Sequence, residues 1–253
     1  MLKRSMLFLS CLFVSLSLFS CATDMAARKN QSEASRRLGE GYLAEGNSTA
    51  ALREFLKAEK LYENDAFLQS DLGFAYFAKE EFDLAIVHFK KALELKPDYS
   101  EALNKMGVVY GRLGQWDSAI SSFNRALDNL LYATPHVALC NLGEAYRGKK
   151  DYERSIDSYR KALKTEPRFP TAFRGLALTY MAMGNYEAAI SSLGKAIQYA
   201  PRFANAYFDL GRAYAGQSET GEAISAFNMV VELAADTPLA DMALEEIRKL
   251  QGN

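Results

Sequence analysis

Apolar residues recur in this chain with helical spacing, and the pattern repeats about every 34 residues. Between Leu72 and Pro97, the sequence LGFAYFAKEEFDLAIVHFKKALELKP contains two stretches with apolar residues three or four positions apart. This spacing predicts two amphipathic helices joined by a tight turn. Pro97 has no backbone N–H and is expected to close the second helix. Such a hairpin cannot bury both of its apolar faces alone, so copies of it are needed on either side.

Four positions of this unit recur six times. A tyrosine occurs at Tyr42, Tyr76, Tyr110, Tyr146, Tyr180 and Tyr214, with spacings of 34, 34, 36, 34 and 34 residues. A small residue precedes it by three positions, at Gly39, Gly73, Gly107, Gly143, Ala177 and Gly211. Another small residue follows it by nine, at Ala51, Ala85, Ala119, Ser155, Ala189 and Ala223. A large residue follows by thirteen, at Phe55, Phe89, Phe123, Tyr159, Leu193 and Phe227.

This pattern resembles the tetratricopeptide repeat, whose period is about 34 residues. The resemblance implies an all-α fold, an α-solenoid of six helix-turn-helix repeats over residues 32–235. Thr237-Pro238 opens a last helix from Leu239 to Leu250, so residues 236–253 are expected to form a polar cap for the end of the stack.

Residues 1–20 have the layout of a secretory signal. Lys3 and Arg4 are followed by an apolar run from Met6 to Phe19, which is too short for a comfortable transmembrane helix. The run ends in Leu18-Phe19-Ser20-Cys21, which resembles the bacterial lipobox, although Phe19 is unusual there. The resemblance implies that Cys21 is acylated and, with Ala22 after it, that the protein resides in the outer membrane. The alternative is an ordinary export signal cut nearby. Residues 21–31 are polar and aperiodic, which predicts a flexible tether.

The balance of basic and acidic residues argues against nucleic acid as a partner. Lys and Arg (30) nearly balance Asp and Glu (31), so no basic face for nucleic acid is expected. Without residues 1–20, 28 basic and 31 acidic residues remain, a net charge of −3. Charge alone would not hold such a protein on anionic lipid, so the acyl chains must provide the anchor.

No catalytic or cofactor motif is present. His136 and Cys140 are four residues apart on one predicted helix, a spacing that suits a metal pair, but the sequence shows no third ligand. Cys140 is expected to be a small buried apolar residue. The aromatic residues that follow the turns, Phe82, Trp116, Tyr152 and Tyr186, share one repeat position and are expected to pack. We therefore expect no enzyme, no metal, no cofactor and no small-molecule substrate.

The expected working surface is the groove that tetratricopeptide arrays form from the first helix of each repeat. By that resemblance, the residues facing the groove in the first three repeats include Leu43, Phe67, Phe74, Phe77 and Val108, with Arg36 and Arg112 at the edges. Later repeats contribute Glu144, Arg147, Leu178, Met181 and Arg212. An apolar groove suits an amphipathic helix or an extended peptide. The alternative is that these aromatics pack on neighbouring repeats. The lysines and asparagines of the family's carboxylate clamp are absent, since Glu40 and Phe74 occupy groove positions in repeats one and two.

The lengthened third junction reads LDNLLYATPHVALCNLGEAY. Together with the lipoprotein signal, the six repeats and the segment SEALNKMGVVYGRLGQWDSAISSFNRAL, it resembles the type IV pilus biogenesis lipoproteins that carry tetratricopeptide repeats. That resemblance implies an outer-membrane lipoprotein of a Gram-negative bacterium that faces the periplasm. It would help the secretin, the pore of the pilus, to reach the membrane and assemble. The alternative is a general cell-envelope adaptor with no role in pili.

Overall fold

The computed structural model describes residues 24–252, and all regular secondary structure over this range is α-helical. An N-terminal helix covers residues 24–44. The helices that follow are α2 (Ser48–Leu61), α3 (Ala66–Ala78), α4 (Phe82–Leu95), α5 (Ser100–Arg112), α6 (Trp116–Leu127), α7 (Pro135–Gly148), α8 (Tyr152–Thr165), α9 (Pro170–Ala182), α10 (Tyr186–Tyr199), α11 (Ala204–Gly216), α12 (Thr220–Leu233) and α13 (Pro238–Gln251). The predicted all-α repeat fold is confirmed.

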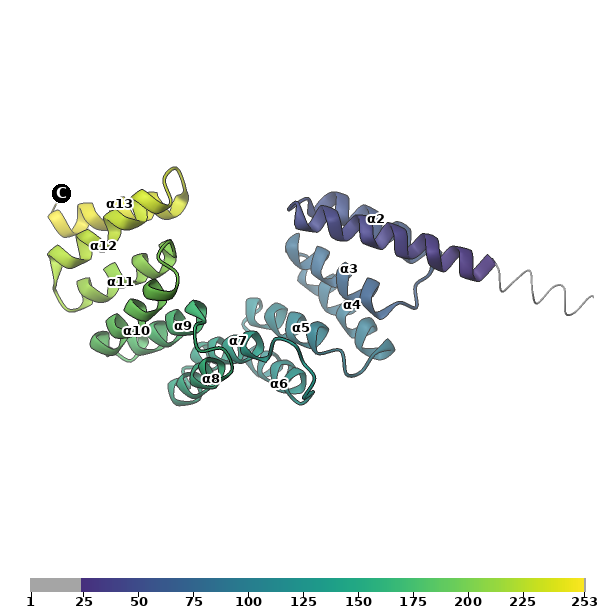
Figure 1. Ribbon diagram of the computed structural model, residues 1–253, viewed down its shortest axis with the longest axis horizontal. Helices are drawn as coiled ribbons and strands as arrows, with labels where there is room; N and C mark the ends of the chain where they lie inside the picture. Colours follow the sequence, from purple (N-terminus) through teal and green to yellow (C-terminus); the bar gives the residue numbers. More distant parts are fainter. Residues whose placement is uncertain (1–23, 253) are drawn as a thin grey trace, which may run out of the picture. The chain divides into compact units, whose positions relative to one another are not determined.

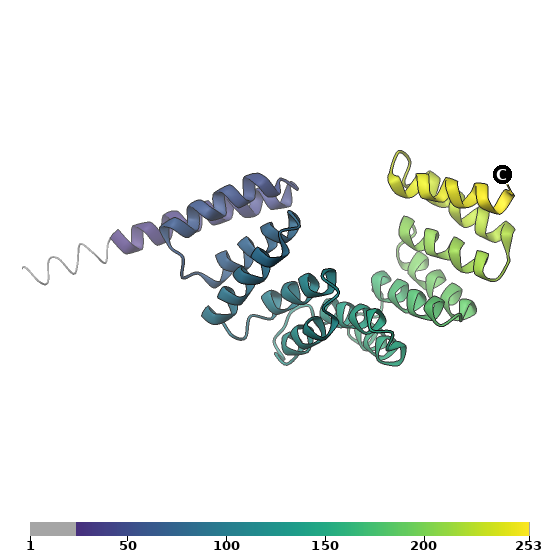
Figure 2. The same ribbon diagram turned by 180° about the vertical axis from the view of Figure 1, so that it is seen from behind.

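The helices divide into two compact units, and the division falls within α5, between Val109 and Tyr110. In each unit, the two helices of a repeat pack against each other, as α3 does on α4 and α9 on α10. The second helix of a repeat also packs on the first helix of the next, as α2 does on α3 and α10 on α11. Figures 1 and 2 show this alternation from two sides.

Close approach of the paired helices depends on the small residue before the repeated tyrosine. A Cβ atom added to Gly211 would lie 2.7 Å from the ring of Phe227, which is fully buried. Repeat five has Ala177 in place of the glycine and Leu193 in place of the ring, and both are fully buried. The side chains at these two positions are therefore complementary in size.

The turns between paired helices are built alike. One residue in each has a φ between 62° and 76°, at Gly46, Glu80, Gly114, Lys150, Gly184 and Ser218. The next residue donates its N–H to the carbonyl of the repeated tyrosine, as in Asn185 N to Tyr180 O at 2.9 Å. Asn47, Asp151 and Asn185 also cap the following helix through their side chains.

The predicted tether is wrong where the structure describes it, because residues 24–31 belong to the first helix. Met25, Ala26, Ala27 and Arg28 are good helix formers, and tertiary contacts extend the helix beyond its own apolar pattern. Arg28 Nη2 donates to the carbonyl oxygen of Lys60 at 3.3 Å.

The predicted signal and Cys21 lie outside the described residues. Within residues 24–252, no helix combines the length and the apolar character needed to span a bilayer.

The lengthened junction between α6 and α7 holds two leucines in solvent. Leu130 is 97% exposed and Leu131 is 90% exposed, whereas the adjacent Tyr132 is buried. Asn129 Oδ1 accepts a hydrogen bond from the Leu131 N–H at 3.0 Å, and Pro135 begins α7. The junction therefore lengthens in part at the expense of α6, which has 12 residues where the second helices of the other repeats have 14.

The last helix, α13, lies where the sequence predicts it. Thr237 caps its first turn, and Gly252 follows its end with a φ of 75°. Its Ala243 and Ile247 join the buried cluster around Phe227, while its charged residues face solvent.

Candidate protein-binding surface

The exposed aromatic residues of the N-terminal unit lie on α3. Phe67 is 45% exposed and Phe74 is 37% exposed, and Phe77 is half-buried. Seven and three residues separate them, so they share one side of the helix. The opposite side of α3 carries Leu68 and Leu72, which are fully buried in the core. The rings on α3 therefore form an apolar surface that the core does not use.

These rings are held in place by ring contacts. The centroids of Phe74 and Phe77 are 6.2 Å apart in a stacked arrangement, and Phe77 lies 6.0 Å from Phe82. Phe67 meets Tyr99 edge to face at 5.2 Å. Because the rings support one another, a ligand would meet a preformed surface.

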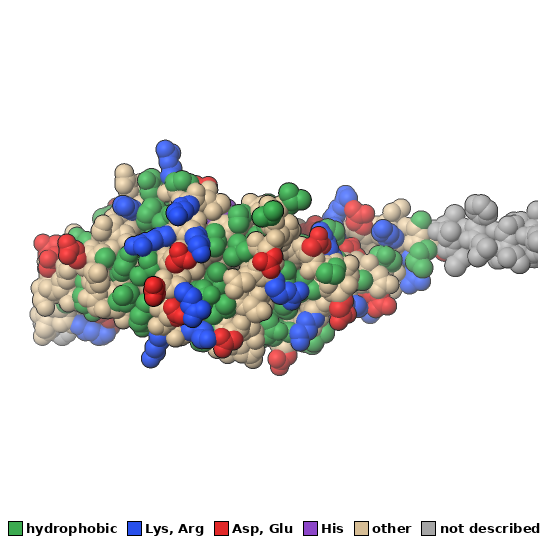
Figure 3. All heavy atoms as spheres, turned by 90° about the horizontal axis from the view of Figure 1, so that it is seen from below, with side chains coloured by type: hydrophobic (Ala, Val, Ile, Leu, Met, Phe, Trp, Pro, Cys, Tyr) green, Lys and Arg blue, Asp and Glu red, His purple; other side chains and the backbone are tan. Residues whose placement is uncertain are grey.

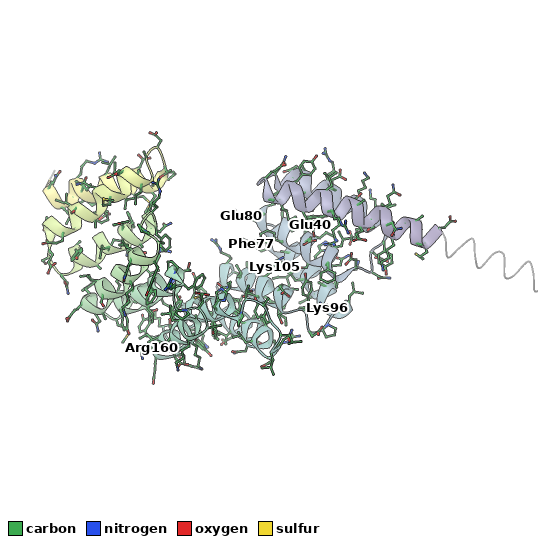
Figure 4. The ribbon with its side chains drawn as sticks, in the orientation of Figure 1. Glu40, Phe77, Glu80, Lys96, Lys105 and Arg160 are labelled. Atoms are coloured by element: carbon green, nitrogen blue, oxygen red, sulfur yellow. The ribbon has the colours of Figure 1, made fainter. Side chains whose placement is uncertain are left out.

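Three cations lie over the exposed rings. Lys105 Nζ is 5.1 Å from the centroid of Phe74, and Lys96 Nζ is 4.9 Å from the centroids of both Phe67 and Tyr99. Arg36 approaches Phe67 to 5.8 Å. Figure 4 labels Lys96, Lys105 and Phe77 in this unit. We call Phe67, Phe74, Phe77, Lys96 and Lys105 the α3 surface; it offers apolar contact and positive charge together.

A cavity of about 450 Å³ adjoins the α3 surface at Phe67. It is lined by Lys29, Glu33, Arg36, Tyr62, Asn64, Asp65, Ala66, Phe67, Leu95 and Lys96. Its cations outnumber its acids, since Lys29, Arg36 and Lys96 face Glu33 and Asp65.

Arg36 is bound into an ion-pair network rather than free at the groove edge. Its Nη1 lies 2.5 Å from Glu40 Oε1 and 3.3 Å from Asp71 Oδ2. Burial raises the pKa of Asp71 to about 6, although Arg36 and Lys105 act in the opposite direction. The main role of Arg36 is therefore to balance the negative charge of the largely buried Asp71 carboxylate.

The remaining predicted groove residues are not all surface residues. Leu43 is half-buried and packs against the core cluster around Phe55. Val108 is half-buried on α5. Arg112 is exposed and belongs to the C-terminal unit.

In the C-terminal unit, the later groove residues line a second cavity of about 320 Å³. Its lining consists of Arg147, Leu178, Met181, Ala182, Tyr186 and Arg212. Glu144, the remaining residue of the predicted set, lies 3.7 Å from Arg147. Tyr186 packs on Gly216, as expected for its repeat position, and also lines this cavity.

The metal-pair hypothesis gains no support from the surroundings of its residues. The ring of His136 packs edge to face on Phe169 at 4.9 Å. Cys140 is buried in the cluster around Tyr159, and this burial raises the pKa of its thiol to about 12. Among the described residues, no group of three or more His, Cys, Asp or Glu side chains is placed to hold a metal ion. Cys140 is thus an apolar core residue.

Sequence reasoning missed the cations of the α3 surface. Lys96 precedes the helix-closing Pro97, and Lys105 lies on α5, so neither is a sequence neighbour of the ring that it covers. On the face drawn in Figure 3, basic, acidic and apolar side chains are interspersed.

Comparison with known proteins agrees with this architecture. Tetratricopeptide repeat models match residues 73–114, 98–165 and 174–238. The structure of MamA is 31% identical, with a TM-score of 0.54, and the match covers 64% of this chain and 94% of that one. The chain belongs to the tetratricopeptide repeat family.

Two solved structures share the fold over most of the chain. PilW, described as a widely conserved type IV pilus biogenesis factor, is 21% identical, with a TM-score of 0.76 and coverage of 84% of this chain and 98% of that chain. PilF of Pseudomonas aeruginosa is 20% identical, with a TM-score of 0.70 and coverage of 87% and 99%. A search of curated protein sequences found no match.

Proposed function

We propose that this protein is an outer-membrane lipoprotein that binds a segment of the secretin through its α3 surface and so assists pilus pore assembly. The observation that carries the proposal is the exposure of Phe67 and Phe74 beside Lys96 and Lys105. The shared fold with PilW and PilF supports the pilus context. Acylation of Cys21 would bring the bound secretin segment to the membrane.

The α3 surface suits an amphipathic segment of a partner. A phenylalanine side chain has about 200 Å² of surface, so covering the exposed parts of Phe67 and Phe74 would stabilise a complex by roughly 2 kcal/mol each. Lys96 and Lys105 would favour acidic residues beside the apolar ones, which makes the complex sensitive to salt.

The test is to replace Phe74 and Phe77 with aspartate in the full chain and to measure secretin multimers in membranes. We expect the multimers to be lost while the helix content and melting temperature stay close to those of the wild type. Because Phe77 is half-buried, Phe67→Asp/Phe74→Asp provides a second variant that changes only exposed side chains.

A matched control is Leu84→Asp/Val87→Asp, which changes two exposed apolar residues on α4 of the same unit. Wild-type multimer levels in both folded phenylalanine variants would exclude the α3 surface as the binding site. Unchanged multimers in cells that lack the protein entirely would instead favour the general adaptor.

Anchoring is tested separately with Cys21→Ala. We expect this variant to leave the outer-membrane fraction while keeping its fold. If it still fractionates with the outer membrane and carries acyl chains, another residue is the lipid attachment site.

A further inference from the structure

One face of α2 carries three cations and two leucines. A shallow cavity of about 470 Å³ lies on this face and is lined by Thr49, Leu52, Arg53, Leu56, Lys57 and Lys60. Successive positions are one or three residues apart, so they lie along one side of the helix. The side chains of Arg53 and Lys57 are 74% and 59% exposed, and the two leucines are half-buried. We call this surface the basic face of α2.

The charge of the basic face is only partly neutralised from within the helix. Glu54 lies 3.9 Å from Arg53 and 3.5 Å from Lys57, and its side chain is 12% exposed. This largely buried carboxylate thus lies beside two of the three exposed cations, which leaves the face net positive.

The lipid anchor would lie close to one end of this face. The first helix begins at Asp24, so only Ala22 and Thr23 separate it from Cys21. Three residue steps span at most about 11 Å. About one turn after its start, the first helix lies beside the end of α2, because Arg28 Nη2 donates to the Lys60 carbonyl oxygen and Lys29 lies 5.7 Å from the centroid of the Tyr62 ring. Figures 1 and 2 show the first helix and α2 side by side.

We propose that the basic face of α2 lies against anionic phospholipid headgroups and thereby fixes the orientation of the N-terminal unit on the membrane. This inference rests on the proposed acylation of Cys21. Lipid is the favoured occupant because the anchor would hold a phosphate-rich surface within reach of Lys60 at high effective concentration. From Lys60 to Thr49 the face extends about 16 Å along the helix axis.

The chemistry of the face fits this role. Arg53, Lys57 and Lys60 would attract headgroup phosphates, while Leu52 and Leu56, which also pack against the core cluster around Phe55, would present only their exposed parts to the membrane. Each cation near an anionic surface favours contact about fivefold, so three favour it roughly a hundredfold before Glu54 is counted. With a mature charge of −3, the acyl chains hold the protein and the basic face orients it.

The test uses the full acylated protein reconstituted into phosphatidylcholine vesicles with or without phosphatidylglycerol. A polarity-sensitive dye is attached at Thr49→Cys, or at Glu101→Cys on α5 as the control position. Cys140 is buried and should not react. We expect the dye at position 49 to shift to shorter wavelength and to be quenched by brominated lipid only when phosphatidylglycerol is present. The effect should disappear near 1 M salt, where the screening length falls to about 3 Å.

A charge variant completes the test. Arg53→Gln/Lys57→Gln/Lys60→Gln should abolish the shift at position 49, whereas Arg160→Gln/Lys161→Gln/Lys164→Gln removes the same charge from exposed positions of α8 and should leave it intact. Equal signals at positions 49 and 101, or a shift that survives the first triple variant, would overturn the basic face as a lipid contact while leaving the anchor in place. A shift that needs an added protein instead of phosphatidylglycerol would overturn the lipid assignment as well. If the wild-type protein does not float with vesicles, the anchor itself is wrong and this inference falls with it.

Discussion

Replacing Gly211 with alanine tests the size complementarity between paired helices. The added Cβ would lie 2.7 Å from Cε1 and 2.8 Å from Cδ1 of Phe227, whose ring is fully buried. Carbon atoms normally approach to about 3.5 Å, so the ring or the helix must move by nearly 1 Å. Overpacking of this kind costs about 1–3 kcal/mol. The helix preference of alanine over glycine returns up to about 1 kcal/mol. We therefore expect a net loss of roughly 1–2 kcal/mol.

The adjacent repeat supplies the compensating change. Repeat five accommodates Ala177 because Leu193 stands where repeat six has Phe227. Gly211→Ala/Phe227→Leu should thus be more stable than the sum of the two single changes predicts, with a coupling energy of about 1–2 kcal/mol. The reciprocal pair, Ala177→Gly/Leu193→Phe, should couple in the same direction.

The assay is urea unfolding of the full chain, followed by circular dichroism, for the wild type, both single variants and the double variant. Gly194→Ala is the control: it lies within α10 with no atom within 4 Å of its added Cβ, so it should stabilise by up to about 1 kcal/mol. Additive single changes, or a Gly211→Ala variant as stable as Gly194→Ala, would refute the argument that ring contact requires glycine.

Three further outcomes follow from buried charge and turn geometry. Because burial raises the pKa of Asp71 to about 6, above its ordinary value of 3.8, its ionisation destabilises the fold above pH 6. The free energy of unfolding should rise as pH falls from 7 to 5, by roughly 1 kcal/mol more in the wild type than in Asp71→Asn. Urea unfolding at the two pH values that gives the same change in this free energy for both proteins would contradict the prediction. Arg174→Met should cost about 3 kcal/mol, since Arg174 Nε is 2.6 Å from the buried carboxylate of Asp209. Adding Asp209→Leu should recover most of that loss; a double variant no better than the single one would show that packing and not charge is responsible. Lys150→Gly should raise the melting temperature, because a left-handed φ of 62° costs a side-chain-bearing residue about 1–2 kcal/mol, more than the entropy that glycine loses; an unchanged or lower value would contradict this reasoning.

The sequence was sufficient to predict the repeat architecture, because the same packing positions recur in every repeat. The recurring tyrosine, small residue and large residue each report one packing contact, and six copies separate that signal from chance. The sequence pattern did not predict that the first helix begins at residue 24, because no recurring pattern covers this segment. Residues 24–31 lack an apolar period, and their helical state depends on contacts with α2 such as Arg28 with Lys60.

The candidate surface could be predicted only in part. The repeat register identified Phe67 and Phe74 as residues outside the core, and the structure leaves both exposed. Leu43 occupies the register of Phe77, and both side chains are half-buried; Leu43 packs against the core cluster around Phe55. The cations over the rings come from other helices, so no one-dimensional pattern reports them.

The loop that carries Leu130 and Leu131 has a practical consequence for handling this chain. Exposed loop tips between intact elements are where chains are most readily opened or extended. Here α6 and α7 pack directly on each other, so their association does not depend on the length of the connecting segment. A reporter domain inserted at this junction would therefore leave the neighbouring helices paired.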